Sequence, residues 1–124
     1  MTLNTSVAEN AEKSLLRVGL AGSLDSDTAP ELEPVLDEAV AGTAELVVLD
    51  MAELDYISSA GLRVIFKASK ALKAAGRRLA VAKRQPQIEK VFEILQALPD
   101  MAVFADDDEL DEYLDAMQAK TRGT

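Results

Sequence analysis

The sequence predicts a single α/β domain in which a small mixed β-sheet packs with about four α-helices. The chain has 124 residues, which is enough for one hydrophobic core. Hydrophobic residues make up 48% of it and aromatic residues only 4%, so Leu, Val, Ile and Ala must fill that core. Short apolar runs alternate with segments of helical periodicity. We expect one domain over residues 1–124, with its core at about 3–117 and a frayed tail at 118–124.

The first two strands are expected to form a hairpin. Residues 3–9 have thin apolar content, and residues 10–12 are expected to form the turn. In Lys13–Leu24, apolar residues alternate along the segment, and two glycines would weaken a helix, so a strand is favoured. Because its apolar content is low, the first strand should lie at an edge of the sheet.

The first helix is expected between Thr28 and Gly42. Thr28 and Glu31 have the spacing of a capping box, and Gly42 is placed to end the helix. Pro34 lies just past the first turn, where it would either kink the helix or move its start later. The apolar face of this helix comprises Leu32, Val35, Leu36, Ala39 and Val40.

The central strand is expected at Leu46–Leu49, an apolar run bounded by Asp50 that suits burial on both faces. Further on, Ser58–Gly61 contains only small residues, so the backbone can turn sharply and present two serines at the start of a helix. Unpaired N–H groups and the helix dipole favour negative charge at that position. The pair suggests phosphate on serine, although a Ser-Ser pair can also serve as a simple helix cap.

The second helix should end near Gly76 and be apolar on one side and basic on the other. Its apolar face comprises Leu62, Ile65, Phe66, Ser69 and Leu72. Its basic stripe comprises Arg63, Lys67, Lys70 and Lys73, followed by Arg77 and Arg78. Such a stripe is usually a solvated face, and otherwise a docking surface for an acidic partner. Arg78–Lys83 should be a strand parallel to the central one, in a right-handed β-α-β unit.

The rest of the chain predicts a third helix, a short apolar segment and a fourth helix. Pro86 opens the third helix and Pro99 follows it. Met101–Ala105 is either a last strand or an extended link. Acidic residues at 106–109 would complement the dipole of the last helix. The apolar positions of that helix are Leu110, Tyr113, Leu114 and Met117.

The string DMAELDYISSAGLRVI, residues 50–65, resembles the STAS domain family, and within it the small cytoplasmic anti-sigma-factor antagonists. The resemblance extends roughly from Leu3 to Leu114. It implies a partner-switching regulator in which a kinase phosphorylates the serine two places before the glycine, which here is Ser59. Ser58 stands where many members carry aspartate, and it is a second, minor candidate for phosphorylation.

The resemblance also implies a partner-binding surface. In this family the loop matched by GSLDSDTAPEL lies beside the phosphorylated serine and contributes to partner binding, a role that carries over to Asp25. A turn-forming or capping aspartate is the alternative interpretation. Gly61 suggests a close approach of backbone or partner. The expected partner-binding residues are Asp25, Ser58, Ser59, Ala60, Gly61, Leu62 and Arg63.

The implied partners are proteins. In this family the unphosphorylated form binds an anti-sigma factor that is also an ATP-dependent serine kinase, and so releases the sigma factor. Phosphorylation blocks binding, and a serine phosphatase of the metal-dependent family resets the switch. ATP and metal ions then belong to the partners, and this chain needs no cofactor. A partner switch or scaffold with another output, such as stress signalling or secretion control, is the alternative.

Composition excludes several classes of function. The chain has no Cys and no His, so disulfides, thiolate catalysis, a Ser-His-Asp triad, a histidine phosphorelay and an imidazole metal site are impossible. A net charge of -9 argues against nucleic acid and anionic membranes as partners. No apolar run is long enough for a membrane span or a signal peptide, so we expect the cytoplasm.

Two enzyme-like or signalling alternatives have poor support. A receiver domain phosphorylated on Asp50 would need an acidic pair after its first strand, and two strands precede the first helix here. A hydrolase with Ser59 as nucleophile would need a G-x-S-x-G elbow and a histidine base. We therefore expect a binding regulator and not an enzyme.

Overall fold

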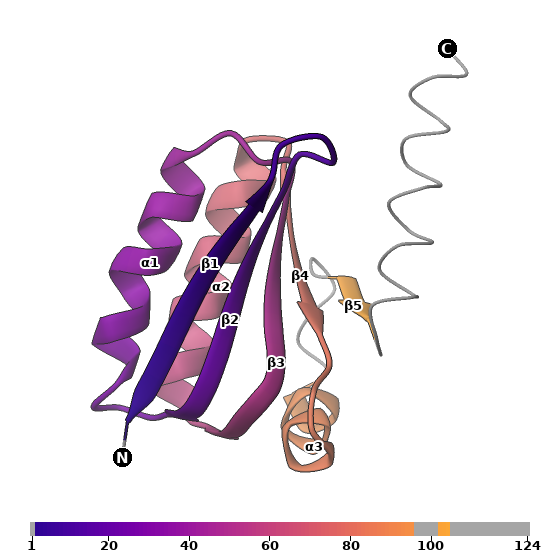
Figure 1. Ribbon diagram of the computed structural model, residues 1–124. Helices are drawn as coiled ribbons and strands as arrows, with labels where there is room; N and C mark the ends of the chain where they lie inside the picture. The colour runs from indigo at the N-terminus through magenta and orange to yellow at the C-terminus, as the bar shows by residue number, and fades with distance from the viewer. Residues whose placement is uncertain (1, 96–101, 105–124) are drawn as a thin grey trace.

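The computed structural model describes residues 2–95 and 102–104, and in this part of the chain five strands form one mixed sheet in the order β1-β2-β3-β4-β5 (Figure 1). β1 runs antiparallel to β2, and β2, β3, β4 and β5 are mutually parallel. The predicted hairpin, edge strand and parallel pairing are therefore confirmed, and Ala102–Phe104, within the apolar segment after Pro99, form a strand. The strands are β1 (Leu3–Asn10), β2 (Leu15–Leu24), β3 (Leu46–Ile57), β4 (Arg78–Ala82) and β5 (Ala102–Phe104).

Three helices connect the parallel strands in the described part of the chain. They are α1 (Ala29–Ala41), α2 (Ser59–Ala74) and α3 (Pro86–Leu95). α1 and α2 lie side by side and cover one face of the sheet, whereas α3 lies beside the lower end of β3, away from α1 (Figure 1). The predicted fourth helix and the tail lie outside the described residues.

β3 is buried on both faces, as its apolar run predicts. Val47 and Leu49 belong to the large cluster between the sheet and the helices, together with Leu36 of α1 and Leu72 of α2. The alternate side chains of the sheet form a second cluster on the opposite face, because successive residues of a strand point to opposite sides. That cluster comprises Leu15, Leu46, Val48, Ala80 and Ala82.

β3 is longer than predicted, because it continues through Asp50 and the acidic segment up to Ile57. In this second half the buried residues are Met51, Leu54 and Ile57, at intervals of three rather than two. The pairing with β2 shifts register twice along this stretch, and such bulges disrupt the alternation that identifies a strand in a sequence. The strand therefore leads directly into the serine turn.

The start of α1 differs from the prediction. The Thr28 hydroxyl does not cap the helix; it donates to the Ser23 carbonyl at 2.8 Å and accepts the Asp25 N–H at 2.8 Å. The capping-box prediction is wrong because Thr28 has helical backbone angles (φ -96°, ψ -19°), whereas an N-cap residue is usually extended. A later start at Pro34 is also wrong, since α1 runs from Ala29 through this exposed proline.

The end of α2 fixes the position of Arg77. Gly76 has a positive φ of 74°, and the Gly76 and Arg77 N–H groups donate to the carbonyls of Lys73 and Leu72, as in a Schellman motif. The Arg77 guanidinium then donates to three carbonyls of the α1 C-terminus and the loop after it, those of Ala39, Val40 and Ala44, at 2.8, 2.6 and 2.7 Å. Arg77 is therefore a structural cap and does not belong to the predicted basic stripe.

Candidate functional site

The ends of β2 and β3 bring the Asp25 loop and the serine turn together. Leu24 pairs with Ile57 in the last register position of the two strands, and the Ser58 N–H donates to the Leu24 carbonyl at 2.8 Å. Because parallel strands leave a sheet at the same edge, the residues that follow them are neighbours. The structure therefore places the loop that begins with Asp25 beside the first turn of α2.

The two serines of this turn have different environments. Ser58 is the N-cap of α2, and its Oγ accepts the Gly61 N–H at 3.2 Å. Ser59 is the first helical residue and is exposed, and its hydroxyl makes no hydrogen bond with any described residue. The Ser58 hydroxyl is thus used by the fold, whereas the Ser59 hydroxyl is available to a partner.

The first turn of α2 favours an added negative charge. A helical N–H donates to the carbonyl four residues earlier, and for Ser59 and Ala60 that residue lies before the helix. The helix itself therefore offers no acceptor to these two N–H groups. The helix dipole has its positive end at this turn, and the turn contains no acidic residue. A phosphate on Ser59 would therefore be stabilised locally by the backbone.

Asp25 organises the loop beside this turn. Its Oδ1 accepts the N–H groups of Asp27 and Thr28, both at 2.9 Å, and its carbonyl accepts the Ala29 N–H at 2.8 Å. The Thr28 N–H, more than the other contacts, holds the pKa of the Asp25 carboxyl below its ordinary value of 3.8. The capping interpretation of Asp25 therefore has a direct structural basis.

The other predicted binding residues divide into exposed and buried ones. Arg63 is exposed and Ala60 is half-buried, whereas Gly61 and Leu62 are buried. A Cβ added to Gly61 would lie 2.5 Å from Leu24 Cγ and 3.2 Å from the Leu24 carbonyl oxygen. The close approach at Gly61 is thus made by β2 of the same chain, and Gly61 and Leu62 can affect a partner only through the position of α2.

Sequence reasoning missed Tyr56 as a surface residue of this site. Tyr56 is 50% exposed and lies two residues before Ser58, at the end of β3. No regular period in the sequence marks Tyr56 as exposed, because its buried neighbours Leu54 and Ile57 are three positions apart rather than two. An exposed tyrosine is a residue type that often contributes much of the energy of a protein interface.

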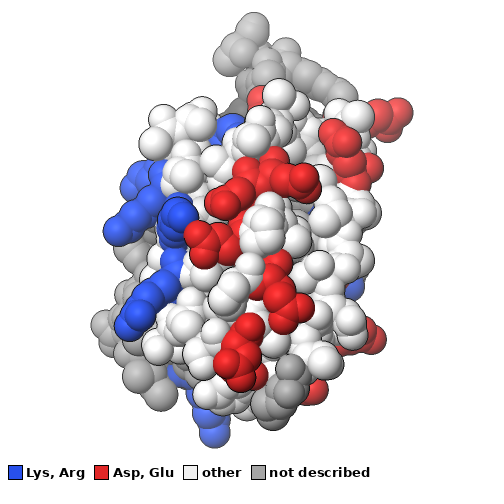
Figure 2. Space-filling view, turned by 90° about the vertical axis from the view of Figure 1, so that its left-hand side faces the viewer, with Lys and Arg blue, Asp and Glu red and all other residues white. Residues whose placement is uncertain are grey.

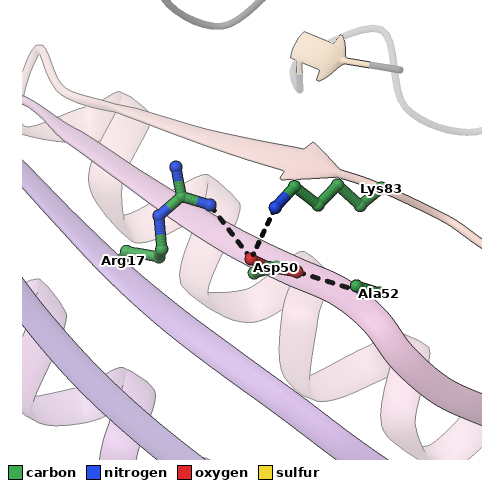
Figure 3. Close-up of polar contacts among 4 residues, drawn as sticks. All are labelled: Arg17, Asp50, Ala52 and Lys83. Carbon is green, nitrogen blue, oxygen red and sulfur yellow. Dashed lines mark hydrogen bonds and ion pairs between the residues drawn. The ribbon is translucent and has the colours of Figure 1, made fainter. Parts of the chain in front are cut away.

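Asp50 has a structural environment and lies well before the serine turn on β3. Its Oδ2 accepts the Arg17 guanidinium from β2 at 3.0 Å and lies 3.7 Å from Lys83 Nζ after β4, and its Oδ1 accepts the Ala52 N–H at 3.0 Å (Figure 3). This half-buried carboxylate therefore connects β2, β3 and the residue that follows β4. No group of three or more Asp, Glu, His or Cys residues that could hold a metal ion occurs among the described residues.

Charges of opposite sign gather on neighbouring parts of the helical side. Figure 2 shows acidic side chains across the side where α1 lies and basic side chains along one edge of it. The two sets meet where Lys67 Nζ of α2 bonds Glu33 of α1 at 2.9 Å, and this contact raises the pKa of Lys67. Among the described helices, none is long and apolar enough to cross a membrane.

Comparison with known proteins identifies relatives of this chain. It is 41% identical over 75 residues, 60% of its length, to BtrV of Bordetella bronchiseptica, a candidate anti-sigma factor antagonist, and the alignment spans 65% of BtrV. An anti-sigma factor antagonist from Mycobacterium paratuberculosis has a TM-score of 0.79 at 21% identity, with 90% of this chain and 93% of that chain covered.

The fold is also that of SpoIIAA, an anti-sigma factor antagonist of known structure. Its unphosphorylated form matches with a TM-score of 0.72 at 18% identity, covering 89% of this chain and 96% of that one. The phosphorylated form from Bacillus matches with a TM-score of 0.67 at 18% identity, covering 89% and 99%. The model of the STAS domain family matches residues 6–110. The chain therefore belongs to the STAS domain family.

Proposed function

We propose that this protein is an anti-sigma factor antagonist whose binding is switched by phosphorylation of Ser59. The unphosphorylated protein binds an anti-sigma factor that is also an ATP-dependent serine kinase, and the sigma factor is released. A serine phosphatase of the metal-dependent family removes the phosphate. The protein acts by binding alone, in the cytoplasm, without catalysis, a cofactor, nucleic acid or a membrane.

The observation that carries this proposal is the difference between the two serines. Ser59 is exposed and its hydroxyl is uncommitted among the described residues, whereas the Ser58 hydroxyl caps α2. A kinase can therefore modify Ser59 without disturbing the helix start. The relatives named as anti-sigma factor antagonists, one of them solved with and without phosphate, support the same switch.

Phosphate on Ser59 would oppose binding through charge and bulk. It adds about -1.5 to -2 charge at a turn that lies beside the loop that begins with Asp25. Burying a charge in an interface where the partner offers no matching counter-ion costs several kcal/mol of desolvation, which corresponds to a loss of affinity of about a hundredfold or more. The proposed partner surface is formed by Asp25, Tyr56, Ser58, Ser59, Ala60 and Arg63.

The first test is the site of modification. Incubation with the cognate kinase and ATP should add one phosphate at Ser59, mapped by intact mass and fragment spectra. Ser59→Ala should abolish the modification, while Ser58→Ala should keep it and lose about 0.5–2 kcal/mol of stability, since it removes a helix cap. Phosphate found mainly on Ser58 or on a threonine would contradict the assignment.

The second test is binding to the same kinase by calorimetry. Ser59→Ala should bind like the wild type, and the phosphorylated protein should bind about a hundredfold more weakly or worse. Ser59→Asp should also bind weakly and melt within a few degrees of the wild type, because negative charge suits a helix N-terminus. Equal affinity of the phosphorylated and unmodified proteins would show that no such switch exists.

A further inference from the structure

We propose that Arg63 is the intramolecular counter-ion of a phosphate on Ser59, so that the phosphorylated protein carries a phosphoserine–arginine ion pair on the first two turns of α2. This inference deepens the proposed function and rests on it for its biological meaning. Phosphorylation would then have a second effect, because the added phosphate would also pair with Arg63, a cation of the proposed partner surface.

The spacing of the two residues places their side chains together. Ser59 and Arg63 both lie in α2, four residues apart, and both are exposed. Residues at this spacing are neighbours on one helix face, with Cβ atoms about 5–6 Å apart. Helical side chains tilt toward the N-terminus, so a side chain as long as that of Arg63 can reach back to Ser59. An anion four residues before a cation is also the favourable order of such a pair.

Arg63 is available for this contact. It forms no hydrogen bond or ion pair with any described residue, and no acidic residue in the first turn of α2 competes for it. The next cation of the basic stripe, Lys67, is already bonded to Glu33 at 2.9 Å and is two turns away from Ser59, about 12 Å along the helix axis. Lys70 is one turn further still.

The chemistry of the two groups suits a strong contact. A phosphate presents three acceptor oxygens and about -1.5 to -2 charge, and a guanidinium presents a planar set of donors that can bind two of those oxygens at once. Pairing with Arg63 would favour the doubly charged form of the phosphate. The second pKa of the phosphoserine, ordinarily about 6, should therefore be lowered in the wild-type protein.

The test measures this pKa in the full-length protein with phosphoserine placed at position 59 during translation. Phosphorus NMR would follow its titration in the wild type, Arg63→Gln, Arg63→Lys and Lys70→Gln. The other charged groups on packed elements are the same in all four proteins: Asp25 in the β2–α1 loop, and Glu33 with Lys67. Differences between variants then report on the substituted cation.

Arg63→Gln should raise the second pKa by about 0.3 pH units or more, the shift that corresponds to an ordinary surface pair at this spacing. Lys70→Gln, which removes the same charge from a more distant position, should raise it less, and Arg63→Lys should be intermediate. Equal pKa values in Arg63→Gln and Lys70→Gln would overturn the proposal, since long-range charge alone would then account for the effect.

A second measurement needs no substitution. The Arg63 guanidinium N–H resonance should shift between the proteins with serine and phosphoserine at position 59, and an unchanged resonance would also overturn the proposal. Neither experiment uses a kinase. A failure here would leave the proposed switch at Ser59 intact, and a failure of kinase modification would leave the measured ion pair unaffected.

Discussion

Gly61 and Gly76 lie at opposite ends of α2 and need glycine for different physical reasons. At Gly61 the obstacle is space, because an added Cβ would collide with the fully buried Leu24. At Gly76 the obstacle is the backbone, whose φ is 74°, while an added Cβ would meet nothing within 4 Å. Replacing either glycine by alanine should therefore destabilise the protein, through a steric clash at Gly61 and through backbone strain at Gly76.

These mechanisms can be separated by substitution. Gly61→Ala should lower the free energy of unfolding by about 1–3 kcal/mol through overpacking, and Gly76→Ala by about 1–2 kcal/mol through left-handed strain. Gly76→Asn should recover part of its loss, since asparagine tolerates that conformation, whereas Gly61→Asn should be worse than Gly61→Ala. Urea denaturation of the four variants checks this, and recovery by Gly61→Asn would refute the packing explanation.

Asp25 can be tested for its two roles separately. Asp25→Asn keeps an oxygen that can accept the Asp27 and Thr28 N–H groups but removes the charge, whereas Asp25→Ala removes both. We expect Asp25→Ala to lower the melting temperature by a few degrees at neutral pH and Asp25→Asn to lower it less. Weaker partner binding by Asp25→Asn than by the wild type would show that the charge contributes to the interface. Unchanged binding would restrict Asp25 to the capping role.

The lowered pKa of Asp25 also predicts a pH dependence. The ionised carboxyl is favoured in the folded protein, so its stabilising effect is present above pH 3.8 and is lost as pH falls through the lower, folded-state pKa. The difference in melting temperature between wild type and Asp25→Asn should therefore approach zero below the folded-state pKa of Asp25. A difference that stays constant down to pH 2 would show that the charge is not involved.

At the scale of elements, Arg77 connects the C-terminus of α1 to the end of α2. Its guanidinium donates to three carbonyls there, and a cation at a helix C-terminus also complements the dipole. Arg77→Ala should lower the free energy of unfolding by about 1.5–3 kcal/mol, and Arg77→Lys should recover only part, because an ammonium lacks the planar donor set.

Lys70→Ala is the matched control for Arg77. Lys70 is an exposed basic residue of α2, and its loss should change stability by no more than about 0.5 kcal/mol. Chemical denaturation of the three variants measures the difference. Similar losses for Arg77→Ala and Lys70→Ala would mean that the carbonyl contacts contribute little.

Most elements could be predicted because their apolar residues follow a regular period. The prediction stopped too early in β3, where two register shifts against β2 change the spacing of Met51, Leu54 and Ile57. Thr28 is the N-cap residue of α1, but the predicted side-chain cap does not form, because the Thr28 hydroxyl donates to the carbonyl of Ser23 in the preceding strand. Both errors arise from contacts between segments, which local sequence patterns do not contain.

At the scale of the whole molecule, the candidate site depends on which strand ends meet. The serine turn itself was evident from small residues before a helical pattern, and its proximity to Asp25 came from the family resemblance. The structure supplies the physical cause, the parallel pairing of Leu24 with Ile57. The exposure of Tyr56 could not be predicted, because it depends on the irregular second half of β3.

The exposed tyrosine gives a test of where on the molecule the partner binds. Tyr56 and Val7 are the large hydrophobic residues that are most exposed in the described part of the chain, at 50% and 56%. Tyr56 adjoins the serine turn, whereas Val7 lies on the edge strand opposite Val18, in the middle of β2.

If the partner covers the end of the sheet that carries Ser59, Tyr56→Ala should weaken binding at least tenfold and Val7→Ala should not. Both variants should melt close to the wild type, since neither side chain is buried. Calorimetry with the partner kinase measures both affinities, and a larger loss for Val7→Ala would move the interface to the β1 edge and away from the proposed switch.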